Sequence, residues 1–282
     1  MQKTRKIKLI LTGQPTMEGA GVHLNRLFGH AEAPTFDPFL MLDDFRSDKP
    51  EHFLKGFPWH PHRGIETITY VLKGDVDHGD SLGNKGIISS GDVQWMTAGS
   101  GIIHQEMPKG DAHGSMHGFQ LWANLPASQK MIAPKYRDIK ADLIPEVVVQ
   151  NGVNIKVIAG DIEGVKGPMD DIIIDPEYLD CTLPPGQTFT HPVDPSYTAF
   201  IYVIGGSGAT DSSSIKNGTL VLFDTGNHIS LTAGDEGLRV LLLTGKPLNE
   251  PVAWQGPIVM NTQEELTTAF QEYRDGNFIK EA

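Results

Sequence analysis

The sequence predicts an all-β protein made of two β-rich domains, with a single helix near the C-terminal end. Strand-like runs recur along the whole chain and are bounded by Gly, Pro, Asn or Asp. Glycine, at 31 residues, and proline, at 19, are frequent without a repeat period, which suits short strands joined by tight turns. A length of 282 residues is ample for two domains. Together these features indicate sandwiches or barrels.

Ten runs are rich in strand-forming residues and flanked by turn signals. They are Lys6–Thr12, Thr67–Leu72, Gly86–Ser89, Val93–Met96, Phe119–Ala123, Val153–Ala159, Ala199–Val203, Thr219–Phe223, His228–Leu231 and Leu238–Leu243.

The two halves of the chain look like rough copies of each other. In the first, a His-rich strand that ends at Gly74 is followed by a turn at Gly91-Asp92 that opens another strand. In the second, a strand that ends at Gly205 is followed by Gly234-Asp235, which introduces Leu238–Leu243. The repetition suggests that the two domains share one architecture.

One helix is predicted near the C-terminal end. Thr262 and Glu265 form a capping box, and Gly276 supplies a stop. The apolar residues between them fall at helical spacing: Leu266, Ala269, Phe270 and Tyr273.

The stretch from Pro126 to Pro145 has few strand signals and three prolines, as a linker would. We therefore predict an N-terminal domain over residues 1–130 and a C-terminal domain over residues 131–282 that includes the helix.

The composition limits the partners and the compartment. A formal net charge of −12 argues against direct binding of nucleic acid, which draws on clustered Lys and Arg. The only cysteine, Cys181, cannot form an internal disulfide and is predicted to be a packed apolar residue, which favours a reducing, cytoplasmic location, or a nuclear one in a eukaryote. The apolar run Ile7–Leu11 is too short for a signal peptide or a membrane span.

Two short segments carry the predicted chemistry. His60 and His62 are two residues apart, so on an extended strand both imidazoles point to the same face. Pro61, between them, makes that strand irregular or places it at an edge. His104 and Glu106 repeat the spacing and place an imidazole beside a carboxylate.

These four side chains predict a site for one divalent metal. A single histidine is more often a packed or surface residue than a ligand, but two pairs at matching spacing in one β-rich half make coincidence much less frequent. Three imidazoles and one carboxylate suit iron, manganese, nickel, copper or zinc. Calcium would need more oxygen ligands, and a structural zinc site would more often use thiolates.

The motif His-x-His, three residues, Glu66, then Gly74, followed by the strand with His104, resembles the two motifs of the cupin superfamily. More narrowly, several segments over nearly the whole chain are similar to the pirin family. They are Pro38 to Phe45, Gly56 to Thr67, Gly91 to Gly99, Gly101 to Pro108, Gln120 to Trp122, Pro247 to Val252, Gly256-Pro257 and Val259 to Thr262.

The resemblance implies a bicupin, that is, two cupin-type β-barrels with one mononuclear metal in the N-terminal barrel, and Fe(II) as that metal. Its ligands fall on His60, His62, His104 and Glu106, while Glu66, a ligand in other cupins, is expected beside the site. The second half keeps His191 but has neither the His-x-His nor the His-x-Glu pattern, so it is expected to hold no metal.

The resemblance also implies an activity, that of a quercetinase, a dioxygenase that opens the central ring of a flavonol with O2. In that role Glu106 would also accept the flavonol proton. Candidates for the pocket wall, each of which could equally be a core residue, are Phe57, Trp59, Trp95, Met96, Gln120 and Trp122. Candidates for contacts around the ligands are Asp43, Asp44, Arg63, Glu66, His78 and His117.

Two other functions are compatible with the sequence. Pirins are also associated with transcriptional regulation, in which the oxidation state of the metal would alter a surface around Arg63 that meets a regulatory protein. A cupin-type sugar-phosphate isomerase is a further alternative, and the pirin-like segments count against it. The residues do not distinguish the metals, the substrate or the oligomeric state.

Overall fold

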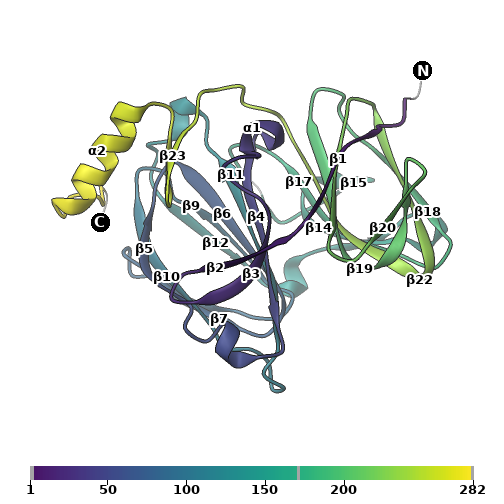
Figure 1. Cartoon of the computed structure of the whole chain (residues 1–282), viewed down its shortest axis with the longest axis horizontal. Coiled ribbons are helices and arrows are strands. Elements are labelled where there is room, and N and C mark those ends of the chain that lie inside the picture. Colours follow the sequence, from purple (N-terminus) through teal and green to yellow (C-terminus); the bar gives the residue numbers. More distant parts are fainter. Residues whose placement is uncertain (1–2, 170–171, 281–282) are drawn as a thin grey trace. The chain divides into compact units, whose positions relative to one another are not determined.

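The computed structural model describes residues 3–169 and 172–280 (Figure 1). These residues form two compact units, and each unit is assembled from stretches that are far apart in the sequence. The N-terminal barrel unit comprises Gln14–Thr35, Phe39–Ala141 and the chain from Leu248 onward. The C-terminal barrel unit comprises the N-terminal residues up to Gly13, Phe36–Pro38 and Asp142–Pro247.

Two antiparallel sheets build the N-terminal barrel unit. The larger has the order β12-β9-β6-β11-β4-β3-β2, with β2 Gln14–Glu18, β3 Val22–Phe28, β4 Phe39–Ser47, β6 Ile65–Lys73, β9 Val93–Thr97, β11 Met116–Asn124 and β12 Lys135–Ile139. The smaller has the order β5-β10-β7-β8, with β5 Phe57–His62, β7 Val76–Asp80, β8 Lys85–Ile88 and β10 Ile102–Pro108.

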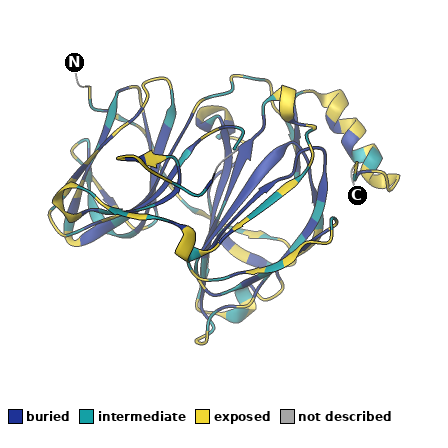
Figure 2. Ribbon diagram, turned by 180° about the vertical axis from the view of Figure 1, so that it is seen from behind, coloured by how far each residue is buried: buried dark blue, intermediate teal, exposed yellow. Residues whose placement is uncertain are grey.

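The end of the chain packs on this same unit. We call residues 248–280 the C-terminal segment. It contains the hairpin of β23 (Ala253–Gln255) and β24 (Ile258–Met260), and then helix α2 (Gln263–Arg274). Thr262 and Glu265 form the capping box that the sequence predicts. Leu266 and Ala269 are buried against Ile258, Met260 and Phe278, so the helix is held by one apolar face (Figure 2).

One nine-stranded antiparallel sheet builds the C-terminal barrel unit. Its main order is β1-β21-β19-β22-β17-β14-β13, with β18 on β22 and β20 on β19. The bounds are β1 Ile7–Thr12, β13 Glu146–Val148, β14 Asn154–Ala159, β17 Glu177–Leu183, β18 Thr188–Pro192, β19 Thr198–Thr210, β20 Ser213–Lys216, β21 Thr219–Phe223 and β22 His228–Gly245. A separate hairpin joins β15 Asp161–Ile162 and β16 Val165–Lys166.

Short helices connect strands in both units. They are α1 Ala33–Phe36 and the 3-10 helices Pro50–His52, Ala127–Gln129, Ala141–Leu143 and Gln150–Gly152.

Alternation of apolar residues explains the core of this unit. Leu238, Val240 and Leu242 of β22 point inward, and Cys181 of β17 joins them in the same core. Burial raises the pKa of the Cys181 thiol well above its ordinary value, so this side chain packs as a small apolar residue, as the sequence predicts.

Three features differ from the sequence-based expectation. Gly234-Asp235 does not open a new strand, because β22 runs without a break from His228 to Gly245. Residues 126–145 are not a plain linker, since Lys135–Ile139 pairs with β9 as an edge strand. The units also divide the chain differently from 1–130 and 131–282: β1 pairs with β21 of the C-terminal barrel unit, and the C-terminal segment packs on the N-terminal one (Figure 1). Strand pairing across 200 residues leaves no local signal.

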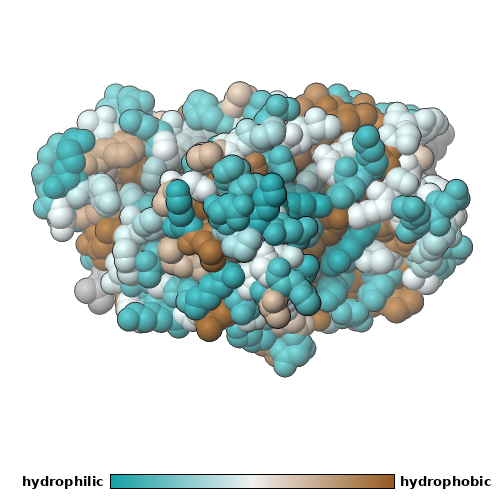
Figure 3. Space-filling view, turned by 60° about the horizontal axis from the view of Figure 1, so that its bottom comes forward, coloured by the Kyte–Doolittle hydropathy of each residue, from teal (hydrophilic) through white to brown (hydrophobic). Residues whose placement is uncertain are grey.

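The surface shows mixed polarity. On the face seen in Figure 3, hydrophobic residues form small patches separated by hydrophilic ones. No helix among the described residues is long and apolar enough to cross a membrane.

Candidate metal centre

Three imidazoles converge inside the N-terminal barrel unit. His60 and His62 lie two residues apart on β5, and His104 on β10 is the direct cross-strand partner of His60. The Nε2 atom of His60 lies 3.0 Å from Nε2 of His62 and 2.9 Å from Nε2 of His104. Strand alternation and strand pairing together therefore bring three ring nitrogens to one point, and each residue of this group has a ligand atom within 4.8 Å of the others.

Each ring is held from behind through its other nitrogen. His60 Nδ1 lies 2.8 Å from the carbonyl oxygen of Pro58, and His62 Nδ1 lies 3.2 Å from that of Pro257. A carbonyl oxygen can only accept, so both Nδ1 atoms carry the proton and both Nε2 atoms present lone pairs. His104 Nδ1 lies 3.2 Å from the hydroxyl of Tyr136, which can accept in the same way. With the Tyr136 hydroxyl as the acceptor, His104 also presents its Nε2 lone pair toward the other two rings.

The charge state of the rings follows from their surroundings. Burial, and then the neighbouring imidazoles, hold the pKa of His62 and of His104 well below the ordinary histidine value. Neutral rings that face each other with lone pairs repel, and a cation between them removes that repulsion. Three imidazole nitrogens at this separation are a metal-binding donor set.

Glu106 lies two residues beyond His104 but is not part of the group of three. A register shift separates His104 from Glu106 in the pairing with β5, and Glu106 lies opposite Phe57. Thr69 Oγ1 donates to Glu106 Oε1 at 3.0 Å, and Gln120 Nε2 donates to both carboxylate oxygens at 3.2 Å. The carboxylate is thus buried and fixed by two neutral donors in the wall of the cavity described next.

A cavity of about 580 Å³ opens beside the imidazoles. It lies between the two sheets of this unit, since its walls come from β3, β4, β6 and β11 as well as from β5 and β10. Its lining residues are mostly apolar, and the charged ones are Glu18, Arg26, Asp43 and Glu106. Arg26 is engaged by Asp43 in a bidentate ion pair and also by Glu18, so its one positive charge is shared between two carboxylates.

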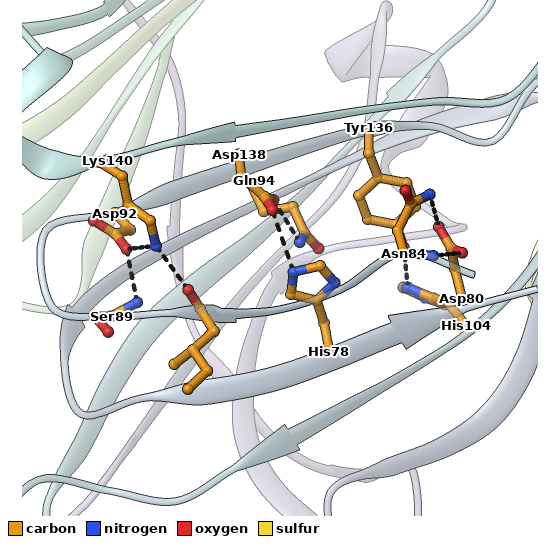
Figure 4. A network of polar contacts seen from close by, with 11 residues as sticks. His78, Asp80, Asn84, Ser89, Asp92, Gln94, His104, Tyr136, Asp138 and Lys140 are labelled. Carbon is orange, nitrogen blue, oxygen red and sulfur yellow. Dashed lines mark hydrogen bonds and ion pairs between the residues drawn. The ribbon is translucent and has the colours of Figure 1, made fainter. Parts of the chain in front are cut away.

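A polar network lies behind His104 (Figure 4). The ring of Tyr136, on edge strand β12, stacks on that of His78 at 5.7 Å between centroids. His78 Nε2 lies 3.4 Å from a carboxylate oxygen of Asp138, whose other oxygen accepts from Gln94 at 2.9 Å. The hydrogen bond from His78 lowers the pKa of Asp138. Burial opposes this change, and the hydrogen bond from Gln94 adds to it, so that the pKa stays below its ordinary value. The network holds Tyr136 in place against His104.

Of the predicted wall residues, three line the cavity and three do not. Phe57, Gln120 and Trp122 line it. Trp59 is 51% exposed, because its side chain alternates away from those of His60 and His62 on the irregular strand β5. Trp95 and Met96 are fully buried in β9 and pack in the core of the unit.

The residues predicted to surround the ligands occupy different places. Asp43 lines the cavity. Glu66 is fully buried, accepts a hydrogen bond from Thr97 at 2.7 Å, and has a pKa raised by burial. His117 lies near Asp44, at 3.7 Å, rather than near the imidazoles. Arg63, next to His62, points to the C-terminal segment, where it pairs with Glu272.

Several contacts of the site have no signal in the sequence. Tyr136 and the carbonyl of Pro257 hold the rings of His104 and His62, and Thr69 and Gln120 hold Glu106, yet they come from four separate segments. Every residue has a backbone carbonyl, so the spacing of residue types in the sequence cannot show which carbonyl contacts His62. Gln120 alone was expected near the site.

Among its described residues, the C-terminal barrel unit has one histidine–carboxylate pair. His191 Nε2 lies 3.1 Å from Glu177, which also accepts from Thr244 at 2.8 Å. Among the described residues of this unit, no three His, Cys, Asp or Glu side chains converge as they do around His60.

Comparison with known families matches both units. Residues 21–123 match the family model for pirin, and residues 178–279 match that for the pirin C-terminal cupin domain. A pirin-like protein of Caulobacter vibrioides is 45% identical over 97% of this chain and 99% of its own length. A pirin-like protein of tomato, Solanum lycopersicum, is 42% identical over 92% of this chain and 88% of its own.

Solved structures also match the chain over most of its length. A quercetin 2,3-dioxygenase of Acinetobacter baumannii matches with a TM-score of 0.90 at 34% identity, over 98% of this chain and 99% of that one. A bacterial pirin of Escherichia coli, solved in complex with nickel(II), matches in fold with a TM-score of 0.65 at 22% identity, over 85% of this chain and 98% of that one. These matches establish the fold as two cupin-type β-barrels with a C-terminal helix.

Proposed function

The chain belongs to the pirin family, and on this basis we propose that it is a mononuclear metalloprotein that opens the central ring of a flavonol with O2. The metal we propose is Fe(II), held by His60, His62, His104 and Glu106. The observation that carries the proposal is the convergence of three Nε2 atoms, two of them from His60 and His62 in the wall of a cavity large enough for a small aromatic molecule.

The spacing of the donors fits one ion. Two nitrogens that are each about 2.1 Å from an ion and at right angles around it lie about 3 Å apart. The two Nε2 separations, 3.0 and 2.9 Å, match that value. Imidazole and carboxylate donors also suit Mn, Ni, Cu and Zn. Elemental analysis of the protein purified from its own host identifies the metal that it binds in the cell.

Glu106 has two roles in the proposal. Its carboxylate offsets one of the two charges of a divalent ion, and it accepts the proton of the flavonol 3-hydroxyl. Thr69 and Gln120 orient it, while Oε2 accepts a hydrogen bond from Gln120 alone among the described partners. This oxygen is the site at which we expect the proton to arrive.

The apolar walls would hold the rings of the substrate and exclude water. Phe57, Met41 and Trp122 face the cavity, and Trp122 packs edge-on against the ring of His62, with 5.0 Å between centroids. A bound divalent metal would supply a Lewis acid that lowers the pKa of the flavonol hydroxyl, together with a redox-active centre.

The test is aerobic incubation of Fe(II)-loaded protein with quercetin. The flavonol absorption should fade while oxygen is consumed, and His104→Ala should abolish both. His191→Ala, a histidine of the C-terminal barrel unit, is the matched control and should retain the full rate. Turnover by the wild type that is no faster than that of His104→Ala would refute the enzymatic function.

The structure offers less to the regulatory alternative. That hypothesis needs Arg63 to act on a surface that meets another protein. Arg63 is only 1% exposed, and its guanidinium is engaged by Glu272 and by the carbonyl of Phe278. The residue thus serves the interior of the unit, and we favour the enzymatic function.

A further inference from the structure

We infer that the C-terminal segment is a working part of the metal centre, in which it holds His62 in the metal-binding tautomer and supplies one wall of the cavity. The inference rests on the proposed function, because it concerns how a proposed metal ligand is positioned. It assigns a role to a segment whose contacting residue, Pro257, is 195 positions away from His62 in the sequence.

The contact with the site is made by the turn between β23 and β24. The carbonyl oxygen of Pro257 lies 3.2 Å from Nδ1 of His62. Trp254, Gly256 and Pro257 line the cavity. The Trp254 ring lies 5.9 Å from that of Trp122, which in turn packs against His62. One short hairpin therefore touches both the ligand and the space beside it.

The hairpin is bound to the residues that directly follow His62. Val259 N donates to the carbonyl of Arg63 at 3.1 Å, and Arg63 and Ile258 form a parallel bridge. At Gly64, whose φ is +76°, an added Cβ would lie 2.0 Å from the carbonyl oxygen of Val259. Only glycine permits this close approach.

A buried lysine, Lys130, joins the same two segments, the residues after His62 and the β23–β24 hairpin. Lys130 is 1% exposed, and its ammonium donates to the carbonyl oxygens of Gly64 at 2.9 Å and Val259 at 3.0 Å, and to the side chain of Asn124 at 2.7 Å. Its three hydrogens thus have three oxygen partners. Lys130 ties the turn after His62, the end of β11 and the C-terminal segment together.

Arg63 provides a second attachment farther along the segment. Its guanidinium donates to Glu272 of α2 at 2.7 Å and to the carbonyl of Phe278 at 2.9 Å, and it lies 4.3 Å above the ring of Phe278. A cation buried this deeply is stabilised only by such partners. The segment is therefore fixed at both its hairpin and its far end.

These attachments matter because the carbonyl of Pro257 decides which nitrogen of His62 carries the proton. A ligand imidazole whose other nitrogen donates to a fixed acceptor keeps its tautomer and its orientation, and loss of such a partner costs about 10–100-fold in metal affinity. The C-terminal segment supplies that acceptor for His62.

The experiment weakens each attachment away from the ligands and measures Ni(II) binding by full-length protein. Lys130→Met removes the clamp on Val259 at similar volume, and Phe278→Leu removes the ring beneath Arg63. Both should bind Ni(II) at least about tenfold more weakly than wild type. Lys140→Met is the control, since Lys140 also donates to a backbone carbonyl and to a side-chain oxygen, but these belong to Ile87 and Asp92, outside the C-terminal segment.

A second measurement separates positioning from general destabilisation. In metal-free protein, nitrogen-15 correlation spectra of the imidazoles should show His62 protonated at Nδ1 in wild type and Lys140→Met, and a mixture of tautomers in the other two variants. Circular dichroism confirms that each is folded, and the milder Phe278→Leu remains informative if Lys130→Met does not fold.

The possible results are distinct. If wild type binds Ni(II) and both variants bind it equally well, or if Lys140→Met is weakened as much as they are, the inference is wrong while the proposed metal site stands. If wild type itself binds no Ni(II), Co(II) or Fe(II), the proposed function fails and the inference fails with it.

Discussion

At the scale of single residues, the site depends on where three protons sit. The carbonyls of Pro58 and Pro257 draw the protons of His60 and His62 to Nδ1, and Tyr136 can do the same for His104. The Nε2 atoms of His60 and His62 are left as lone pairs, and so is that of His104 when Tyr136 accepts its proton. Metal affinity should therefore respond to the partners of the ligands as well as to the ligands themselves.

Tyr136→Phe tests this for His104. The substitution removes the hydroxyl 3.2 Å from Nδ1 and keeps the ring that stacks on His78. We expect metal affinity to fall by about tenfold or more, with little change in the melting temperature of the metal-free protein. The measurement is isothermal titration calorimetry with Ni(II). Unchanged affinity would show that Tyr136 does not position His104.

The stability of the metal-free protein should depend on pH through the same rings. The pKa values of His62 and His104 are depressed in the folded state, so below about pH 6.5 the unfolded chain binds protons that the folded chain does not. The free energy of unfolding should therefore decrease as the pH falls, by up to about 1.4 kcal/mol per pH unit for each ring.

Urea unfolding between pH 7.5 and 5.5 measures this dependence. The reference is the double variant His62→Gln/His104→Gln, in which this contribution is absent and the slope should be smaller. Equal slopes for the two proteins would mean that these histidines titrate alike in both states.

At the scale of elements, strand pairing brings the ligands together and the C-terminal segment closes the site. β5 and β10 place His60 opposite His104, while the β23–β24 hairpin reaches the carbonyl of Arg63. The backbones of Gly64 and Val259 approach so closely that a Cβ added at Gly64 would lie 2.0 Å from the Val259 carbonyl oxygen. This close approach can be tested by adding a single methyl group.

Gly64→Ala should destabilise the protein by about 2–5 kcal/mol, from left-handed backbone strain and overlap with the Val259 carbonyl. Gly83→Ala is the matched control: its φ is +91° and nothing lies within 4 Å of the added Cβ, so only about 1–2 kcal/mol of strain is expected. Chemical denaturation gives both values. Equal losses would mean that the hairpin yields readily at this contact.

At the scale of the whole molecule, each unit is completed by a stretch from the other end of the chain. β1 pairs with β21 in the C-terminal barrel unit, and the C-terminal segment belongs to the N-terminal barrel unit (Figure 1). A ligand that binds one unit should therefore stabilise segments that are distant in sequence and leave the core of the other unit unchanged.

Hydrogen–deuterium exchange with and without Ni(II) tests this. We expect slower exchange in β5, β10 and the β23–β24 hairpin on metal binding, because metal bound to the folded state suppresses opening of these elements. Exchange in β21 and β22 should not change. Protection confined to β5 and β10 would show that the hairpin is not coupled to the metal.

The sequence by itself determined whatever depends on short-range geometry. The alternation of side chains on a strand predicted that His60 and His62 share a face, and the capping box predicted helix α2. The convergence of His104 with them was also predicted, because the same ligand spacing recurs on a second strand. These patterns repeat within a few residues, so the spacing alone carries them.

Only the tertiary structure decided the rest, because it depends on pairing between distant segments. Trp95 and Met96 are core residues while Trp122 faces the cavity, because the surroundings of each side chain depend on which distant segments pack against its strand. The acceptor for His62 is a backbone carbonyl, which every residue possesses, so only its position in space distinguishes it. The division of the chain between the units followed from strand partners more than 200 residues apart.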